Sequence, residues 1–146
     1  MPINKSNAEH ISNWFRACPA VRADKRFRID YLAETPIEYA IYASPTTMRY
    51  HENILGEEVP DDIQNLNFIF AAKEPYGADI KQNSANLAFF EEVAGWVMEQ
   101  NASRNLPTIN EGMVKSIVPT LTAFPAAIGI DAAKYQIQLK ITYRRA

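Results

Sequence analysis

The sequence has few of the residues from which catalytic and metal sites are most often built. It contains one cysteine, Cys18, and two histidines, His10 and His51. A single cysteine excludes a disulfide within the chain and fits a reducing compartment. Zinc sites need about three or four ligands, most often nitrogen or sulfur, and two histidines and one cysteine hardly supply them. The sequence therefore predicts no metal site and no cofactor.

Glycine is also scarce, and its five occurrences are scattered. A phosphate-binding loop needs clustered glycines, because backbone amides must approach the anion closely. The G-x-S-x-G, H-E-x-x-H and C-x-x-C motifs are missing as well. A Cys18–His pair is a conceivable nucleophilic arrangement, but Cys18 is better explained as a small apolar residue of a helix. We therefore predict no catalytic residues and no enzyme.

Long apolar runs and a surplus of one charge are missing too. No segment has the roughly 18 apolar residues that span a membrane, and residues 1–15 lack an apolar signal-peptide core, so we expect no membrane partner. Fifteen basic and 17 acidic residues give a net charge of -2. That balance argues against a general nucleic-acid binder, whose phosphate contacts need a basic surplus. The 146 residues, 47% of them hydrophobic, suit one domain covering 1–146.

Two segments have the periodicity of amphipathic helices. The first begins at Ser6, where Glu9 completes a capping box, and ends before Pro19. Its apolar stripe consists of Ile11, Trp14, Phe15 and Cys18. The second is predicted over 83–101, with a buried side marked by Phe89, Val93, Trp96, Val97 and Gln100. Gly95 in this helix is interpreted as a place where a strand approaches closely.

Alternating apolar and polar residues predict strands at 26–32, 36–42, 66–71 and, most clearly, 135–144. The stretch "AETP", residues 33–36, joins the first two, a spacing typical of a hairpin. The apolar segment 113–130 contains Pro119 and Pro125, so we expect an edge or bulged strand there. The order of elements predicts an α+β domain, in which two helices pack on one face of a mainly antiparallel or mixed sheet.

The segment from Ser44 to Asn65 has no regular pattern, and we interpret it as a long loop or hairpin arm. It carries five acidic residues: Glu52, Glu57, Glu58, Asp61 and Asp62. Simple solvation, cation binding and acid–base chemistry are open interpretations. If the protein forms a ring, these acids are candidates for lining a channel, because they would repel DNA and let it slide. The basic residues Arg16, Arg22, Lys25, Arg26 and Arg28 form either a solvated surface or a contact for an acidic partner.

Four stretches resemble one protein family: "NWFRACPAV", "IEYAIYASP", "FAAKEPYGADIKQNSANLAFFEEVAGWVMEQNASRNLP" and "KYQIQLKITYRR". They look like the tail terminator proteins, also called tail-completion or minor capsid proteins, of tailed phages and prophages of Gram-positive bacteria. The resemblance implies a sheet with helices on one side and a six-fold ring on the tail tube. Such a ring stops tube growth and offers a docking surface to the head connector, while DNA passes through its lumen without sequence-specific binding. The family has no catalytic residues.

The resemblance also sets expectations for location and for contacts. It places the protein in the bacterial cytoplasm during assembly and then at the head-proximal end of the virion tail. The five acids are candidates for the interface or lumen, and Arg28, Lys140, Arg144 and Arg145 are candidates for contacts to the tube or connector. One alternative is another head-tail joining or head-completion adaptor. The other is a small enzyme whose general base would be His10 or His51.

Overall fold

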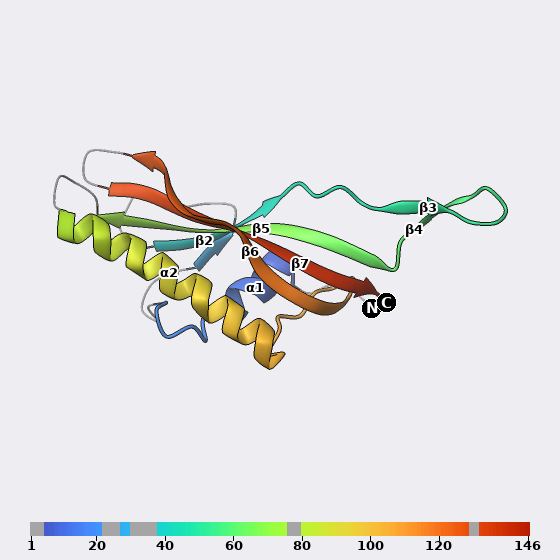
Figure 1. The fold of residues 1–146 in the computed structure, drawn as a ribbon, viewed down its shortest axis with the longest axis horizontal. Helices are drawn as coiled ribbons and strands as arrows, with labels where there is room; N and C mark the ends of the chain where they lie inside the picture. Colours follow the sequence, from blue (N-terminus) through green and yellow to red (C-terminus); the bar gives the residue numbers. More distant parts are fainter. Residues whose placement is uncertain (1–4, 22–26, 30–37, 76–79, 129–131) are drawn as a thin grey trace.

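A five-stranded sheet forms the body of the protein (Figure 1). The computed structural model describes residues 5–21, 27–29, 38–75, 80–128 and 132–146. The strand order is β1-β2-β5-β7-β6, and the strands are β1 (Phe27–Ile29), β2 (Glu38–Ser44), β5 (Ile63–Pro75), β6 (Gly112–Ile128) and β7 (Ala132–Arg145). All neighbours are antiparallel except β1 and β2. The predicted α+β class with a mainly antiparallel sheet is therefore confirmed.

The hairpin predicted between residues 26–32 and 36–42 is wrong. The strands β1 and β2 are parallel, with Phe27 opposite Tyr39 and Ile29 opposite Ile41. Of the strand predicted over 26–32, the described part is β1, Phe27–Ile29. A parallel partner requires the chain to return by about 10 Å, which the intervening residues 30–37 are long enough to span. Those residues lie outside the described part of the chain.

Helix α1 (Asn7–Phe15) begins where the sequence predicts. The Ser6 side-chain oxygen accepts a hydrogen bond from the backbone N–H of Glu9 at 3.2 Å, which satisfies one of the amides left free at a helix start. The helix ends at Phe15, earlier than Pro19 alone suggests. Cys18 follows the helix in a turn and is still buried.

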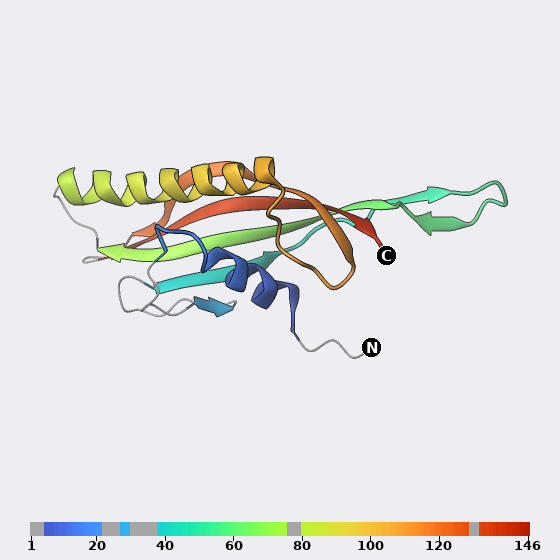
Figure 2. The ribbon, with the colours of Figure 1, turned by 90° about the horizontal axis from the view of Figure 1, so that it is seen from below.

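Helix α2 (Ile80–Ser103) is longer than predicted and runs along the sheet (Figure 2). Its buried stripe is Asn86, Phe90, Val93 and Val97, which follows the i, i+4, i+7 spacing of one helix face. Phe89, Trp96 and Gln100, also predicted for the buried side, are only half-buried. The interpretation of Gly95 is also wrong, because it is exposed and a Cβ placed there meets no atom within 4 Å. The sheet lies on the other side of the helix.

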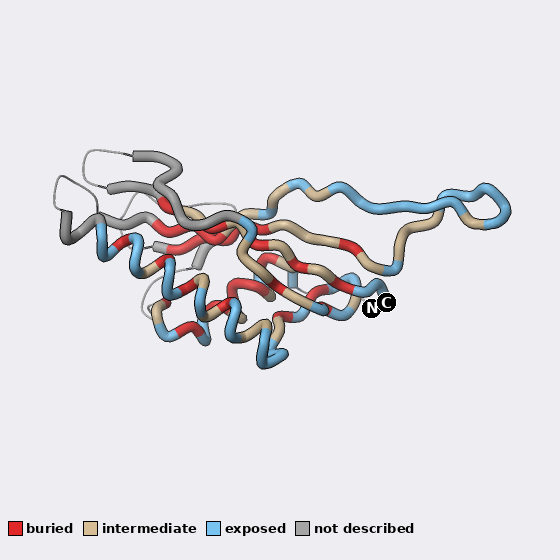
Figure 3. Tube along the Cα trace, viewed as in Figure 1, coloured by how far each residue is buried: buried red, intermediate tan, exposed pale blue. Residues whose placement is uncertain are grey.

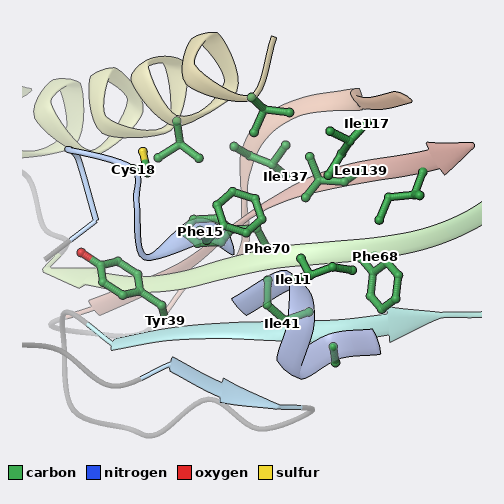
Figure 4. Packing of buried hydrophobic residues seen from close by; sticks show 14 of the residues in the cluster. Ile11, Phe15, Cys18, Tyr39, Ile41, Phe68, Phe70, Ile117, Ile137 and Leu139 are labelled. Carbon is green, nitrogen blue, oxygen red and sulfur yellow. The ribbon is translucent and has the colours of Figure 1, made fainter. Parts of the chain in front are cut away.

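The core lies between one face of the sheet and both helices (Figure 4). Phe15 of α1 stacks on Phe70 of β5 with ring centroids 4.9 Å apart, and Phe90 of α2 stacks on Tyr135 of β7 at 5.4 Å. The alternation predicted for the last strand is confirmed, since its apolar members are all buried: Tyr135, Ile137, Leu139, Ile141 and Tyr143. Their polar neighbours Gln136, Gln138, Lys140 and Thr142 are half-exposed on the opposite face.

Strand β6 lies at the edge of the sheet, as its prolines predict. Its pairing with β7 shifts register at four places, so the strand is bulged along its length. Pro119 lies opposite Leu139 and Pro125 opposite Tyr135. Because proline donates no backbone hydrogen bond, an edge position with bulges is where it fits.

A separate hairpin projects beyond the body (Figures 1 and 2). It consists of β3 (Tyr50–Glu52) and β4 (Glu58–Pro60), which pair in antiparallel fashion and form a two-stranded sheet separate from the main sheet. We call residues 50–60 the arm. Most of the arm is exposed (Figure 3), so it contributes little to the core.

Candidate assembly surface

The tip of the arm is a closed turn built around Asn53. The Asn53 side-chain oxygen accepts hydrogen bonds from the backbone N–H groups of Leu55 at 2.9 Å and Glu57 at 3.0 Å. The Asn53 backbone N–H donates to the Glu57 carbonyl, and the Gly56 N–H donates to the Asn53 carbonyl. Gly56 has a φ of 79°, which glycine adopts without strain. This network fixes the turn although it has no core of its own.

The fixed turn presents two large apolar side chains to solvent. Ile54 is 100% exposed and Leu55 is 77% exposed. A scattered apolar residue on a surface needs no explanation, but two adjacent ones at the end of a projecting hairpin form a local apolar patch. Burying both against a partner would remove most of their surface from water, which contributes about 1.5–3 kcal/mol for each side chain.

Three carboxylates surround this apolar tip. Glu52 and Glu58 are directly opposite each other in the β3–β4 ladder, and Glu57 follows the turn. All three are exposed. Like charges on opposite residues of a hairpin disfavour each other, so a cationic partner would stabilise this arrangement. Of the five predicted acids, the structure therefore gathers three near the tip.

The other two acids lie at the base of the arm. The Asp61 carboxylate is 2.6 Å from His51 Nδ1 and 3.7 Å from Arg49 Nε. The Asp62 side chain is exposed, and its backbone carbonyl accepts a hydrogen bond from the Arg145 N–H at 2.8 Å. Within the described residues, no group of three or more His, Cys, Asp and Glu side chains could hold a metal ion.

Gln64 joins the arm to the body, and the sequence analysis missed it. Its fully buried side chain donates from Nε2 to the carbonyls of Arg49 at 2.7 Å and Asp61 at 3.0 Å, and its Oε1 accepts from the Arg49 N–H at 2.9 Å. Both strands of the arm are thus tied to β5. Gln64 falls in the segment 44–65, which has no regular pattern, so no periodicity indicated that it is buried. The Asn53–Gly56 spacing, in contrast, is recognisable turn chemistry.

The end of β7 forms a shallow pocket near the base of the arm. Its volume is about 390 Å³, and it is lined by Asn110, Gly112, Met113, Arg144, Arg145 and Ala146. We call it the corner pocket. Met113 is 72% exposed there. Gly112 is required for the close pairing, because a Cβ at this position would overlap the backbone carbonyl of Arg144.

Of the four basic residues predicted as contacts, Arg144 and Arg145 lie together and Lys140 lies apart from them. Arg144 and Arg145 line the corner pocket, and Arg145 Nη1 donates to the carbonyl of Pro60 at 3.4 Å. Lys140 lies further along β7 beside a second hollow of about 270 Å³, which also contains Asn67, Thr120 and Gln138. The side chain of Arg28 and residues 22–26 lie outside the described part of the chain.

The residues of the enzyme alternative lie apart from one another. His10 Nε2 is 3.1 Å from the Asn110 side-chain oxygen, and His51 contacts Asp61 on the arm. Burial raises the pKa of the Cys18 thiol, which leaves less of the reactive thiolate at neutral pH. Between Cys18 and either histidine the described structure records no interaction, so these residues do not form a nucleophile–base pair in this conformation.

Among the described residues, no helix is both long and apolar enough to cross a membrane. No protein-family model matches the chain, and no curated protein sequence matches it. Among the described residues, two surface features stand out: the arm with its apolar, acidic tip, and the corner pocket with its basic residues near the base of the arm.

Proposed function

We propose that the protein is a structural component of a phage or prophage particle that closes the tail tube as a ring and joins the tube to the head connector. Support comes from the resemblance of the four quoted stretches to tail terminator proteins. The α+β fold, with both helices on one face of the sheet, agrees with what that resemblance implies. In this role the protein acts in the host cytoplasm during assembly and then at the head-proximal end of the tail.

The observation that carries the proposal is the arm. It projects beyond the body (Figure 1). Its tip is fixed by Asn53, and it exposes Ile54 and Leu55. An exposed apolar tip does not stabilise the isolated chain. Exposed apolar patches mark interaction sites, so the tip is suited to binding a partner. A projecting element that engages a neighbour is suitable for the head-to-tail contacts from which rings are built.

The edges of the sheet supply a second kind of contact surface. Strand β6 is an edge strand over its whole length, although its prolines and bulges limit pairing with another strand. The polar face of the sheet, with Gln138 and Lys140 beside a hollow, offers hydrogen-bonding groups to a tube or connector protein. The three acids near the arm tip are suited to a lumen as well as to a basic partner surface.

A tube-capping experiment tests this function. The purified protein is added to the cognate tail tube protein during tube polymerisation, and the tubes are examined by negative-stain electron microscopy. We expect a ring at one end of each tube and no further growth from that end. Binding to the connector protein without any effect on the tube would favour the adaptor alternative. Tubes that grow unchanged and carry no bound protein would contradict the proposal.

A further inference from the structure

We propose that the arm tip of one copy docks into the corner pocket of a second copy of this chain. The inference rests on the proposed function, because it names the contact that joins neighbouring copies in the proposed ring. Its two halves are the apolar pair Ile54 and Leu55, with their surrounding acids, and the pocket formed by Gly112, Met113, Arg144 and Arg145.

The two surfaces match in polarity. The tip presents two side chains that are almost fully exposed, and the pocket presents the largely exposed side chain of Met113 beside the glycine backbone of Gly112. Methionine adapts its shape to an incoming apolar group, because its side chain is unbranched and flexible. The pocket volume of about 390 Å³ lies within the roughly 300–1,000 Å³ of pockets that enclose small ligands, so two aliphatic side chains fit it.

The two surfaces also match in charge. Glu52, Glu57 and Glu58 give the tip three carboxylates, and the two basic residues Arg144 and Arg145 are among those that line the pocket. Among the described residues, no ion pair occupies either arginine. Glu111, next to Gly112, accepts hydrogen bonds from Asn7 Nδ2 at 2.8 Å through both carboxylate oxygens, which directs its charge toward α1. Arginine is suited to this role because its guanidinium binds carboxylates in a fixed, bidentate geometry.

The occupant of the pocket must come from another copy. The pocket lies near the base of the arm, where Arg145 contacts the backbone of Pro60 and Asp62. Leu55 at the tip comes five residues before Pro60 in the chain, a separation of about 16 Å along an extended strand. Both views show the tip far from the end of β7 (Figures 1 and 2). The bonds of Gln64 hold the base in place. The tip therefore does not reach the pocket of its own chain.

The separation of the two halves also restricts how copies are arranged. Each copy carries a tip at one end of the arm and a pocket at the other, so each can give one contact and receive one. Repeated head-to-tail use of this pairing makes a closed ring or an open chain, whereas a mutual exchange of two arms makes a two-fold dimer. A ring is the arrangement that the proposed function requires.

A disulfide crosslink tests the contact directly. The variant Leu55→Cys/Met113→Cys places one thiol at the tip and one in the pocket, and native Cys18 is buried and does not compete. We expect covalent oligomers on a non-reducing gel after mild oxidation, both for the protein alone at high concentration and for copies bound to the tail tube. The matched control is Leu55→Cys/Met98→Cys, because Met98 is a similarly exposed methionine on α2. The single variant Leu55→Cys controls for tip-to-tip contact.

A charge exchange tests the same contact without new thiols. We expect Glu57→Arg/Glu58→Arg and Arg144→Glu each to weaken self-association by about tenfold or more, and we expect their combination in one chain to restore most of the loss. Arg145 is left unchanged because it contacts the arm base. Crosslinking at Met98 that equals crosslinking at Met113, or a charge exchange without recovery, would overturn the inference.

The inference and the proposed function fail in different ways. Rings on the tail tube that crosslink at neither pair of positions would leave the function standing and overturn the docking of tip into pocket. Efficient crosslinking between Leu55→Cys and Met113→Cys in a protein that never binds a tube would support the docking and contradict the terminator role. Absence of the crosslink in both the free and the tube-bound protein overturns the inference.

Discussion

The role of Gln64 gives a prediction whose magnitude follows from the structure. The change Gln64→Leu keeps a side chain of similar size and removes three hydrogen bonds to the backbone of Arg49 and Asp61. Each such bond contributes about 0.5–1.5 kcal/mol, and the Arg49 carbonyl keeps its hydrogen bond from the Asp61 N–H at 2.9 Å. The added apolar burial offsets about 1 kcal/mol of this loss. We expect the free energy of unfolding to fall by about 2–3 kcal/mol, a large part of the roughly 5–15 kcal/mol typical of a domain.

Two measurements test the Gln64 prediction. Chemical denaturation gives the change in the free energy of unfolding, and amide hydrogen exchange reports on the arm. Exchange of the amides of 49–61 should accelerate more than exchange in β7, because the arm loses its connection to β5. Gln138→Leu is the matched control, since Gln138 is half-exposed on the open face of the same sheet. A stability change below about 0.5 kcal/mol with unchanged exchange in the arm would show that Gln64 does not anchor the arm.

Three further predictions address the core, the corner pocket and the cysteine. Phe70→Ala removes a fully buried ring that stacks on both Phe15 and Tyr39, so calorimetry should show a loss of about 3–5 kcal/mol; a loss below about 1 kcal/mol would contradict this packing. Gly112→Ala places a Cβ against the Arg144 carbonyl, and the resulting strain should lower the free energy of unfolding by about 1–3 kcal/mol. Gly95→Ala adds a Cβ in open space, so it should leave the free energy of unfolding unchanged or raise it. The raised pKa and the burial of Cys18 predict that its thiol reacts slowly with a thiol reagent at pH 7 to 8. The reaction rate should rise with pH and on unfolding. Immediate modification of the native protein would contradict this prediction, because it would show that the thiol is accessible.

Local patterns in the sequence predicted much of the fold. The strict alternation from Tyr135 to Tyr143 placed its apolar residues in the core, and the Ser6 cap placed the start of α1. The prolines at 119 and 125 predicted an edge strand with bulges, which β6 is. These features are readable because each depends on neighbours within a few residues.

The missed features depend on contacts between distant segments. Phe27 and Tyr39 pair in parallel strands, and strand periodicity does not encode that direction. Phe89 and Phe90 are equally apolar, and only the position of the sheet decides that Phe90 is the buried one. Gln64 is buried because the backbone of Arg49 comes close to it across the base of the arm.

The candidate surface, like the fold, could be predicted from the sequence only in part. The sequence marked the segment 44–65, its five acids and the basic residues at the end of β7, but not the way they are grouped. The structure puts Glu52, Glu57 and Glu58 around an apolar tip and assigns Asp61 to His51 and Arg49 at the base. The corner pocket arises where β6 and β7 pair closely at Gly112, a contact between strands that sequence spacing alone does not reveal.

Imaging of the oligomer shows whether the protein assembles into a ring. Native mass spectrometry and negative-stain microscopy over a concentration series, with and without the cognate tail tube protein, measure how many copies associate and in what shape. The account predicts a closed ring with an open centre, formed on the tube or at high concentration, and its loss in Ile54→Asp/Leu55→Asp while Met98→Asp retains it. A protein that remains monomeric at every concentration and does not assemble on the tube would contradict the account.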